Sequence, residues 1–87
     1  MKLLPRINYY VHDAVLQEDG VLRIPLITSD GERVYGDVHV VSPSSRDYKF
    51  WFWLREQCKR RWVQLGVVSL DEQSIEAYRE KYKHEFV

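Results

Sequence analysis

The stretch DYKFWFWLREQCKRRW, residues 47–62, sets large aromatic rings among positive charges. Five of the chain's 13 Lys and Arg residues fall within it. Such a mixture has two explanations. One is a helix that is buried on one side and solvated on the other, and the second is a surface that holds a partner. The way these side chains divide around a helix therefore bears on both the fold and the function.

The residues that flank this stretch predict one long helix over 42–66. Ser42 precedes a proline that fits a first helical turn, and Ser44 with Asp47 offers a competing capping pair. The helical period then continues until Gly66, a residue type that commonly follows a helix.

A helical projection at about 100° per residue separates this segment into two faces. The wide apolar face should pack on the inner side of a sheet, and it holds Tyr48, Trp51, Phe52, Leu54, Cys58, Trp62, Val63 and Leu65. The other face mixes two rings with four cations, and it holds Arg46, Lys49, Phe50, Trp53, Gln57, Arg60, Arg61 and Gln64.

Two interpretations of Phe50 and Trp53 remain open at this point. A second helix carrying Tyr78, Tyr82 and Phe86 would cover both rings, so that the first helix is sandwiched between this second helix and the sheet. Alternatively, the rings are exposed and their cationic neighbours frame a binding site.

The first half of the chain predicts a three-stranded antiparallel meander over 1–41. Apolar and β-branched runs at 7–16, 21–27 and 33–41 are separated by two turns that each contain Asp-Gly. Because Pro25 cannot donate to a ladder, its strand should lie at an edge there, or its amide side should face outward. Gly36 interrupts the inward register and is typical of a bulge or of close contact with a ring.

The alternation in 33–41 assigns side chains to the two faces of the last strand. We expect Val34, Val38 and Val40 to point inward. The side chains expected to point outward are Arg33, Tyr35, Asp37 and His39.

The C-terminal part predicts an amphipathic helix over 69–86. Ser69 and Glu72 have the spacing of a capping box. One narrow apolar stripe should dock on the body of the fold, and it consists of Ile75, Tyr78, Tyr82 and Phe86. The fold class expected for residues 1–87 is therefore a single α+β domain with the element order βββαα.

Composition limits the classes of partner. The formal net charge is zero, but it divides into −2 over 1–41, +4 over 42–66 and −2 over 67–87. A basic middle attracts anions locally without the long-range field of a strongly basic protein. The single Cys58 cannot form an internal disulfide, and the sequence contains no signal-peptide or membrane-span pattern, so we expect a cytoplasmic protein.

Catalytic and metal motifs are missing from the sequence. The three histidines and Cys58 have no ligand spacing, and Cys58 falls on the core face. The glycines occur singly, without a phosphate-binding loop, and no Gly-x-Ser-x-Gly elbow is present. We therefore expect no catalytic residues, no metal, no cofactor and no enzyme activity.

The segment RVYGDVHVVSPSSRDYKFWFWLREQ (33–57) resembles a segment of small phage-encoded proteins of undetermined function. In those proteins a hairpin strand leads through a charged turn into a helix that opens with basic and aromatic residues. The resemblance covers under a third of the chain, and the His-Arg-Lys run of that family is absent. It implies a phage-type accessory or inhibitor protein that acts on nucleic acid or host factors. The matching positions are Arg46, Lys49, Phe50, Trp51 and Trp53.

The predicted function is non-catalytic binding of nucleic acid, or of a complex that contains it, through the basic aromatic helix. Cations would take phosphates while rings stack on bases, and the expected site is Arg46, Lys49, Phe50, Trp53, Arg60 and Arg61, with Arg33 and His39 as an extension. The alternative is a protein partner with an acidic surface, for which the rings are hot spots. A third hypothesis is a homo-oligomer formed through Tyr78, Tyr82 and Phe86.

Overall fold

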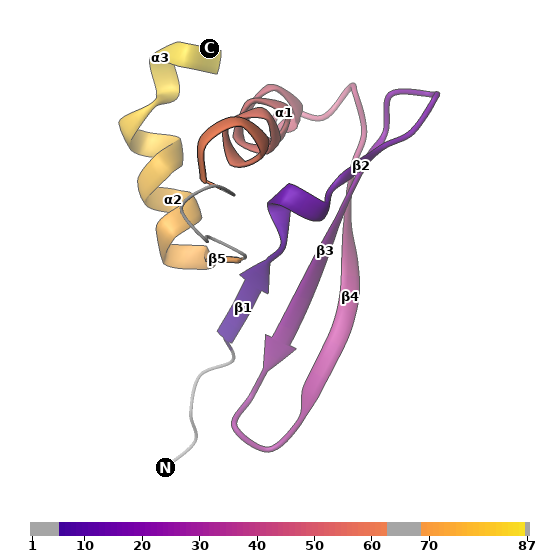
Figure 1. The fold of residues 1–87 in the computed structure, drawn as a ribbon, viewed down its shortest axis with the longest axis vertical. Helices are drawn as coiled ribbons and strands as arrows, with labels where there is room; N and C mark the ends of the chain where they lie inside the picture. Colours follow the sequence, from indigo (N-terminus) through magenta and orange to yellow (C-terminus); the bar gives the residue numbers. More distant parts are fainter. Residues whose placement is uncertain (1–5, 63–68, 87) are drawn as a thin grey trace.

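The computed structural model describes residues 6–62 and 69–86. For Trp62 it describes only the backbone and not the side chain. The elements in chain order are β1 (Arg6–Tyr9), the 3-10 helix η1 (Val11–Asp13), β2 (Val15–Leu16), β3 (Leu22–Ser29), β4 (Val34–Val41), α1 (Tyr48–Gln57), the π-helix η2 (Cys58–Trp62), β5 (Leu70–Asp71), α2 (Glu72–Lys81) and α3 (Lys83–Phe86) (Figure 1). The expected α+β fold with an antiparallel sheet is confirmed. The finer order of three strands and two helices is wrong, because the described residues form five strands and three α-helices.

The long strand β3 organises the sheet. β1 and β2 pair with one side of β3, at different points along it, and β4 pairs with the other side over its whole length. The two-residue strand β5 adds to the far side of β1. All of these pairs are antiparallel, so the sheet order is β2–β3–β1–β5 with β4 added on β3.

Pro25 explains why the first predicted strand is divided into β1, η1 and β2. The Pro25 carbonyl accepts the Tyr10 N–H at 2.8 Å, but proline has no N–H to return to the Tyr10 carbonyl. The Tyr10 carbonyl instead accepts the Asp13 N–H at 3.0 Å, which closes η1. Pro25 therefore lies in the central strand rather than at an edge. Its nitrogen, which carries no hydrogen, faces the point where β1 ends and η1 begins.

The inward and outward faces of β4 are opposite to those expected. Val34, Val38 and Val40 are 70%, 38% and 52% exposed. His39, which was expected to point outward, pairs with the fully buried Ile24 of β3. Because paired residues in an antiparallel sheet share a face, this pairing places His39 on the inner face and the three valines on the outer one.

The glycines mark two turns but no bulge. Gly20 and Gly31 have φ angles of +87° and +93°, and they occupy the two predicted Asp-Gly turns. Gly36 pairs regularly with Ile27 of β3, so the bulge expected there is absent. A Cβ atom added at Gly36 would meet nothing within 4 Å, which also excludes a crossing ring.

The first helix is shorter than predicted at its N-terminus. α1 begins at Tyr48 after the N-cap residue Asp47, so the starts expected at Ser42 or Ser44 are wrong. The Ser42 carbonyl accepts the Ser45 N–H at 2.9 Å, which gives a turn rather than a first helical turn. The predicted helix end and part of the apolar face lie outside the described side chains, namely Gly66, Trp62, Val63 and Leu65.

The C-terminal helix is divided into α2 and α3 at Tyr82. Its N-cap is Asp71, whose side chain accepts the Ser74 N–H at 2.8 Å, and not the predicted Ser69. None of the helices in the described residues is long and apolar enough to cross a membrane. The predicted stripe does dock on the core, through Ile75, Tyr78, Tyr82 and Phe86.

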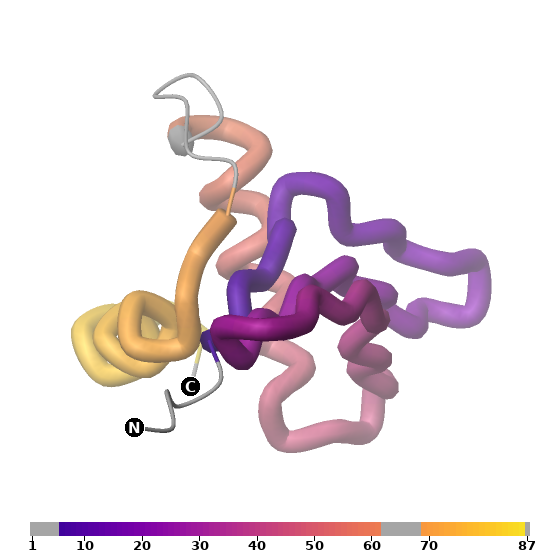
Figure 2. Tube along the Cα trace, turned by 90° about the horizontal axis from the view of Figure 1, so that it is seen from below, coloured from indigo at the N-terminus to yellow at the C-terminus, as the bar shows by residue number. Residues whose placement is uncertain are grey.

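The core lies between the inner face of the sheet and α1. Leu54 of α1 is 0% exposed, and the Trp51 ring lies 5.2 Å from the Tyr9 ring and 5.1 Å from the His39 ring. α2 and α3 pack beside α1, on the side away from the β3–β4 hairpin (Figures 1 and 2). The buried apolar residues are Val11, Ala14, Leu22, Ile24, Val41, Phe50, Trp51, Leu54, Cys58, Leu70 and Ile75.

We expect Leu54→Ala to lower the free energy of unfolding by about 2–5 kcal/mol, because it removes a fully buried side chain and leaves a cavity. Urea denaturation followed by circular dichroism measures this. Phe52→Ala is the matched control on the same helix, and it should cost no more than about half as much because its ring is partly in water already. Equal costs would contradict the packing of α1 against the sheet.

Candidate functional site

An open groove of about 530 Å³ runs between α1 and α3. α1 supplies one wall, η2 adds a single arginine, and the last residues of α3 form the other wall. The lining residues are Tyr48, Lys49, Phe52, Trp53, Glu56, Gln57, Arg60, Glu85 and Phe86. Three of the six predicted site residues therefore lie at this groove.

Phe50 cannot stack on a ligand, because it is only 2% exposed. Its ring lies 5.1 Å from the Phe86 ring, and the Arg79 guanidinium lies 4.7 Å from its centroid. The ring on the supposedly open face is thus held under α2 and α3. Phe50 is a core residue, and its assignment to the site is corrected.

Trp53 is partly covered by Tyr82, which joins α2 to α3, and by Phe86 of α3. Its ring centroid is 5.0 Å from that of Tyr82 and 5.8 Å from that of Phe86. It remains half-buried and forms part of the groove wall. The sandwich interpretation is therefore correct for both rings, although Trp53 still presents some surface to the groove.

Phe52 is the ring that the sequence argument missed. It was expected against the sheet, yet it is 36% exposed and lines the groove. Its ring centroid lies 6.0 Å from that of Tyr48. The helical projection could not reveal this, because the direction from which the C-terminal helix covers α1 is not encoded in α1 itself.

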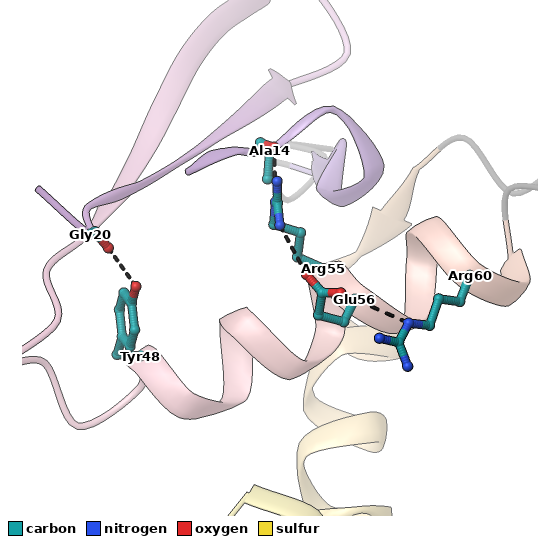
Figure 3. A network of polar contacts seen from close by, with 6 residues as sticks. All are labelled: Ala14, Gly20, Tyr48, Arg55, Glu56 and Arg60. Carbon is teal, nitrogen blue, oxygen red and sulfur yellow. Dashed lines mark hydrogen bonds and ion pairs between the residues drawn. The ribbon is translucent and has the colours of Figure 1, made fainter. Parts of the chain in front are cut away.

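Hydrogen bonds to the N-terminal half of the chain fix the position of α1 (Figure 3). The Tyr48 hydroxyl donates to the Gly20 carbonyl, in the turn between β2 and β3. Near the other end of α1, Arg55 Nε donates to the Ala14 carbonyl at 3.1 Å. The groove wall formed by α1 is therefore held at two separate points along the helix.

The charges at the groove balance. Lys49 and Arg60 supply two positive charges, and Glu56 and Glu85 supply two negative ones. Glu56 forms ion pairs with Arg55 and Arg60 (Figure 3), at 3.0 Å and 3.9 Å between the charged atoms. An anionic ligand would thus meet carboxylates as well as cations in the groove.

The remaining predicted cations lie outside the groove lining. Arg46 is exposed in the turn before α1, and Arg61 is exposed in η2. Arg33 is exposed beside the β3–β4 turn, whereas His39 packs on Trp51 in the inner layer. Burial lowers the pKa of His39. The predicted extension through Arg33 and His39 therefore does not form one surface with the groove.

A smaller polar pocket of about 290 Å³ lies where α2 meets β1 and β4. Among the described residues, neither Trp51 Nε1 nor Arg79 Nε has a hydrogen-bond acceptor there. Arg79 Nε lies 3.7 Å from a Glu76 carboxylate oxygen, and Arg79 Nη1 donates to Asp47 at 2.8 Å. Burial is the main cause that raises the pKa of Tyr9, and the nearby carboxylates add to it. The lining residues are Tyr9, His39, Asp47, Trp51, Glu72, Ile75, Glu76 and Arg79.

Among residues 6–62 and 69–86, the structure contains no group of three or more His, Cys, Asp or Glu side chains that could hold a metal ion. Cys58 is buried and free. Comparison of the chain with protein-family models, with curated proteins and with solved structures gave no match. The function must therefore be argued from the surface alone.

Burial raises the pKa of the Cys58 thiol to about 12. Since the thiolate is the reactive form, its fraction at pH 8 should be lower by about a thousandfold than in an exposed cysteine. We expect a disulfide reagent to leave the folded protein unmodified at pH 8 and to react at once in denaturant. Rapid reaction of the folded protein, without loss of its circular dichroism, would contradict the burial of Cys58.

Proposed function

We propose that the protein is a small, non-catalytic binding protein that holds a segment of a protein partner in the groove between α1 and α3. The expected occupant carries an apolar anchor residue flanked by charged residues of both signs. The observation that supports this proposal is the pairing of exposed aromatic surface with balanced charge at the groove.

The aromatic surface supplies the affinity in this proposal. Phe52 and Trp53 are adjacent in α1, Tyr48 lies four residues before Phe52, and all three line the groove. Aromatic side chains that become fully desolvated at the centre of an interface are typical hot spots. Because Trp53 is already braced by Tyr82 and Phe86, little side-chain entropy would be lost when a partner covers it.

The charges supply orientation. Glu56 and Arg60 already form an ion pair on the groove rim, and Lys49 and Glu85 add one charge of each sign. Charges at a rim contribute more to the choice of partner than to affinity. A partner with only negative charge, as expected for nucleic acid, would face Glu56 and Glu85.

We expect peptides selected from a random library on the wild-type protein to share an apolar anchor and to lose about tenfold or more in affinity on Phe52→Ala and on Trp53→Ala. Fluorescence polarisation with labelled peptides measures the loss. Binding should change little between low and moderate salt, because the anchor is apolar.

Val34→Ala is the matched control for this experiment, since it truncates an exposed apolar residue of β4 that is outside the groove lining. The Val34→Ala variant should bind the selected peptides with the affinity of the wild type. A library without an enriched motif, or peptides that bind the Phe52 and Trp53 variants as well as the wild type, would refute the proposal.

A second candidate function, binding of nucleic acid, is favoured by the run of cations that follows α1. Lys59, Arg60 and Arg61 are consecutive and exposed, and they lie in a π-helix, a form of turn that often occurs at functional sites. With Phe50 buried, the cations would contact phosphates with little base stacking. Such binding would be weak and sensitive to salt.

If this second function holds, Arg60→Ala should lower the salt slope of binding to a mixed-sequence single-stranded oligonucleotide by about one. The slope is measured by titrating the labelled oligonucleotide at several salt concentrations. Trp53→Ala should leave both slope and affinity unchanged. No detectable binding at low salt would exclude this candidate.

The setting proposed for either function is the cytoplasm, where a free, buried Cys58 is compatible with reducing conditions. A phage-type accessory or inhibitor role fits the resemblance of residues 33–57 and a protein partner at the groove. That role makes the partner a host protein. It is tested by the same peptide selection, followed by a search of the host's proteins for the selected motif.

A further inference from the structure

β4 forms a free edge of the sheet. It is eight residues long and pairs with β3 on one side, and within residues 6–62 and 69–86 no element pairs with its other side (Figure 1). An exposed edge strand of this length offers a row of unpaired N–H and C=O groups to another chain.

The hydrogen-bond pattern of Pro25 identifies the residues of β4 whose N–H and C=O groups are unpaired at the free edge. The Pro25 carbonyl points toward β1, because it accepts the Tyr10 N–H. Its partner in β4, Val38, is therefore in a non-hydrogen-bonded pair with β3, and its own N–H and C=O point to the free edge. Consistent with this, the Val38 N–H donates to the side chain of its neighbour Asp37, at 2.7 Å, and not to β3.

The same alternation gives free edge groups to every second residue of β4, namely Val34, Gly36, Val38 and Val40. These are also the residues on the outer face of the sheet, where the three valines are exposed. Val15 of β2 extends this face and is 57% exposed. Free hydrogen-bonding groups and uncovered apolar surface thus coincide in one strand.

The geometry points to a homodimer in which the β4 strands of two copies pair antiparallel about a twofold axis, with Val38 opposite Val38 of the second copy. This interface is independent of the proposed groove function, because none of its residues lines the groove. It also differs from the oligomer hypothesis based on Tyr78, Tyr82 and Phe86, residues that pack within the fold.

The side chains favour this register. It sets Val40 opposite Gly36 of the second copy, and the space above Gly36 is open, since no atom lies within 4 Å of an added Cβ. It sets Asp37 opposite His39, so that a carboxylate faces an imidazole that can donate a hydrogen bond. A shift by one residue in each strand would instead place Asp37 against Asp37, and like charges directly opposite are destabilising.

Pairing replaces a local bond with cross-strand bonds. The Val38 N–H leaves the Asp37 carboxylate and donates to the Val38 carbonyl of the second copy, and the reciprocal bond forms across the axis. The freed Asp37 carboxylate is then available to His39 of the second copy. At the same time the Val38 side chains of the two copies meet on the outer face.

The first test is sedimentation of the wild-type protein from about 1 µM to about 1 mM, a range over which mass action should shift a dimer equilibrium. We expect the mass to rise from 10.5 kDa toward twice that value. Val38→Pro removes the central edge donor without removing a β3–β4 bond, because this N–H is not in that ladder. It should weaken dimerisation by about tenfold or more.

Val38→Thr is the matched control, since it keeps the N–H and the β-branched shape, and it should dimerise nearly as well as the wild type. Circular dichroism of each variant at low concentration reports whether it is folded. A wild-type protein that stays at 10.5 kDa over the whole range, or a folded Val38→Pro variant that dimerises like Val38→Thr, would overturn the proposal.

Cross-linking tests the register in chains that keep every β4 donor. Val38→Cys should be joined efficiently by a reagent that carries two thiol-reactive electrophilic groups and spans about 5–6 Å, the Cα separation of a hydrogen-bonded antiparallel pair. Val34→Cys is the control, because in this register the cysteine at position 34 of one copy lies about 27 Å along the strands from the cysteine at position 34 of the second copy. The native Cys58 is buried and does not compete. Equal cross-linking at both positions, or none at 38, would refute the register.

Discussion

Phe50 and Trp51 are adjacent in α1 and point about 100° apart around the helix, and both are withdrawn from water. Trp51 packs toward the sheet, against the Tyr9 and His39 rings, whereas Phe50 packs under Phe86 and the Arg79 guanidinium. A chain of 87 residues has little interior, and it gains a core here by burying one helix on two sides. The arrangement of the other elements follows, because the sheet must supply one apolar face and the C-terminal helices the second.

This double burial also determines what α1 can offer to a partner. Most of its aromatic surface is used within the fold, so only the strip that includes Phe52 and part of Trp53 remains at the groove. Ion pairs of Glu56 with Arg55 and Arg60 neutralise part of the basic segment. At the groove, a segment that seems suited to nucleic acid when considered alone therefore presents a small, apolar and electrically balanced surface, while Lys59 and Arg61 stay exposed outside it.

The sheet is covered differently from the helix. Its inner face packs on α1, while its outer face holds exposed valines and receives no helix from the described residues. Pro25 has a part in this asymmetry, because its missing N–H diverts the chain into η1, and Val11 of η1 and the following residue Ala14 join the core. β4 is left as a regular strand, and the Asp37 carboxylate accepts the Val38 N–H at its free edge.

Local patterns in the sequence determined the class of fold, both Asp-Gly turns, the antiparallel pairing of the long strands and the apolar stripe of the last helix. Each depends on neighbouring residues, through turn chemistry or through the period of a helix. Tertiary structure alone decided which face of β4 is covered and whether Phe50 or Phe52 reaches solvent. Alternation and helical period divide side chains between faces, but a face becomes buried only when a distant segment packs on it. For β4 and α1, that segment lies elsewhere in the chain.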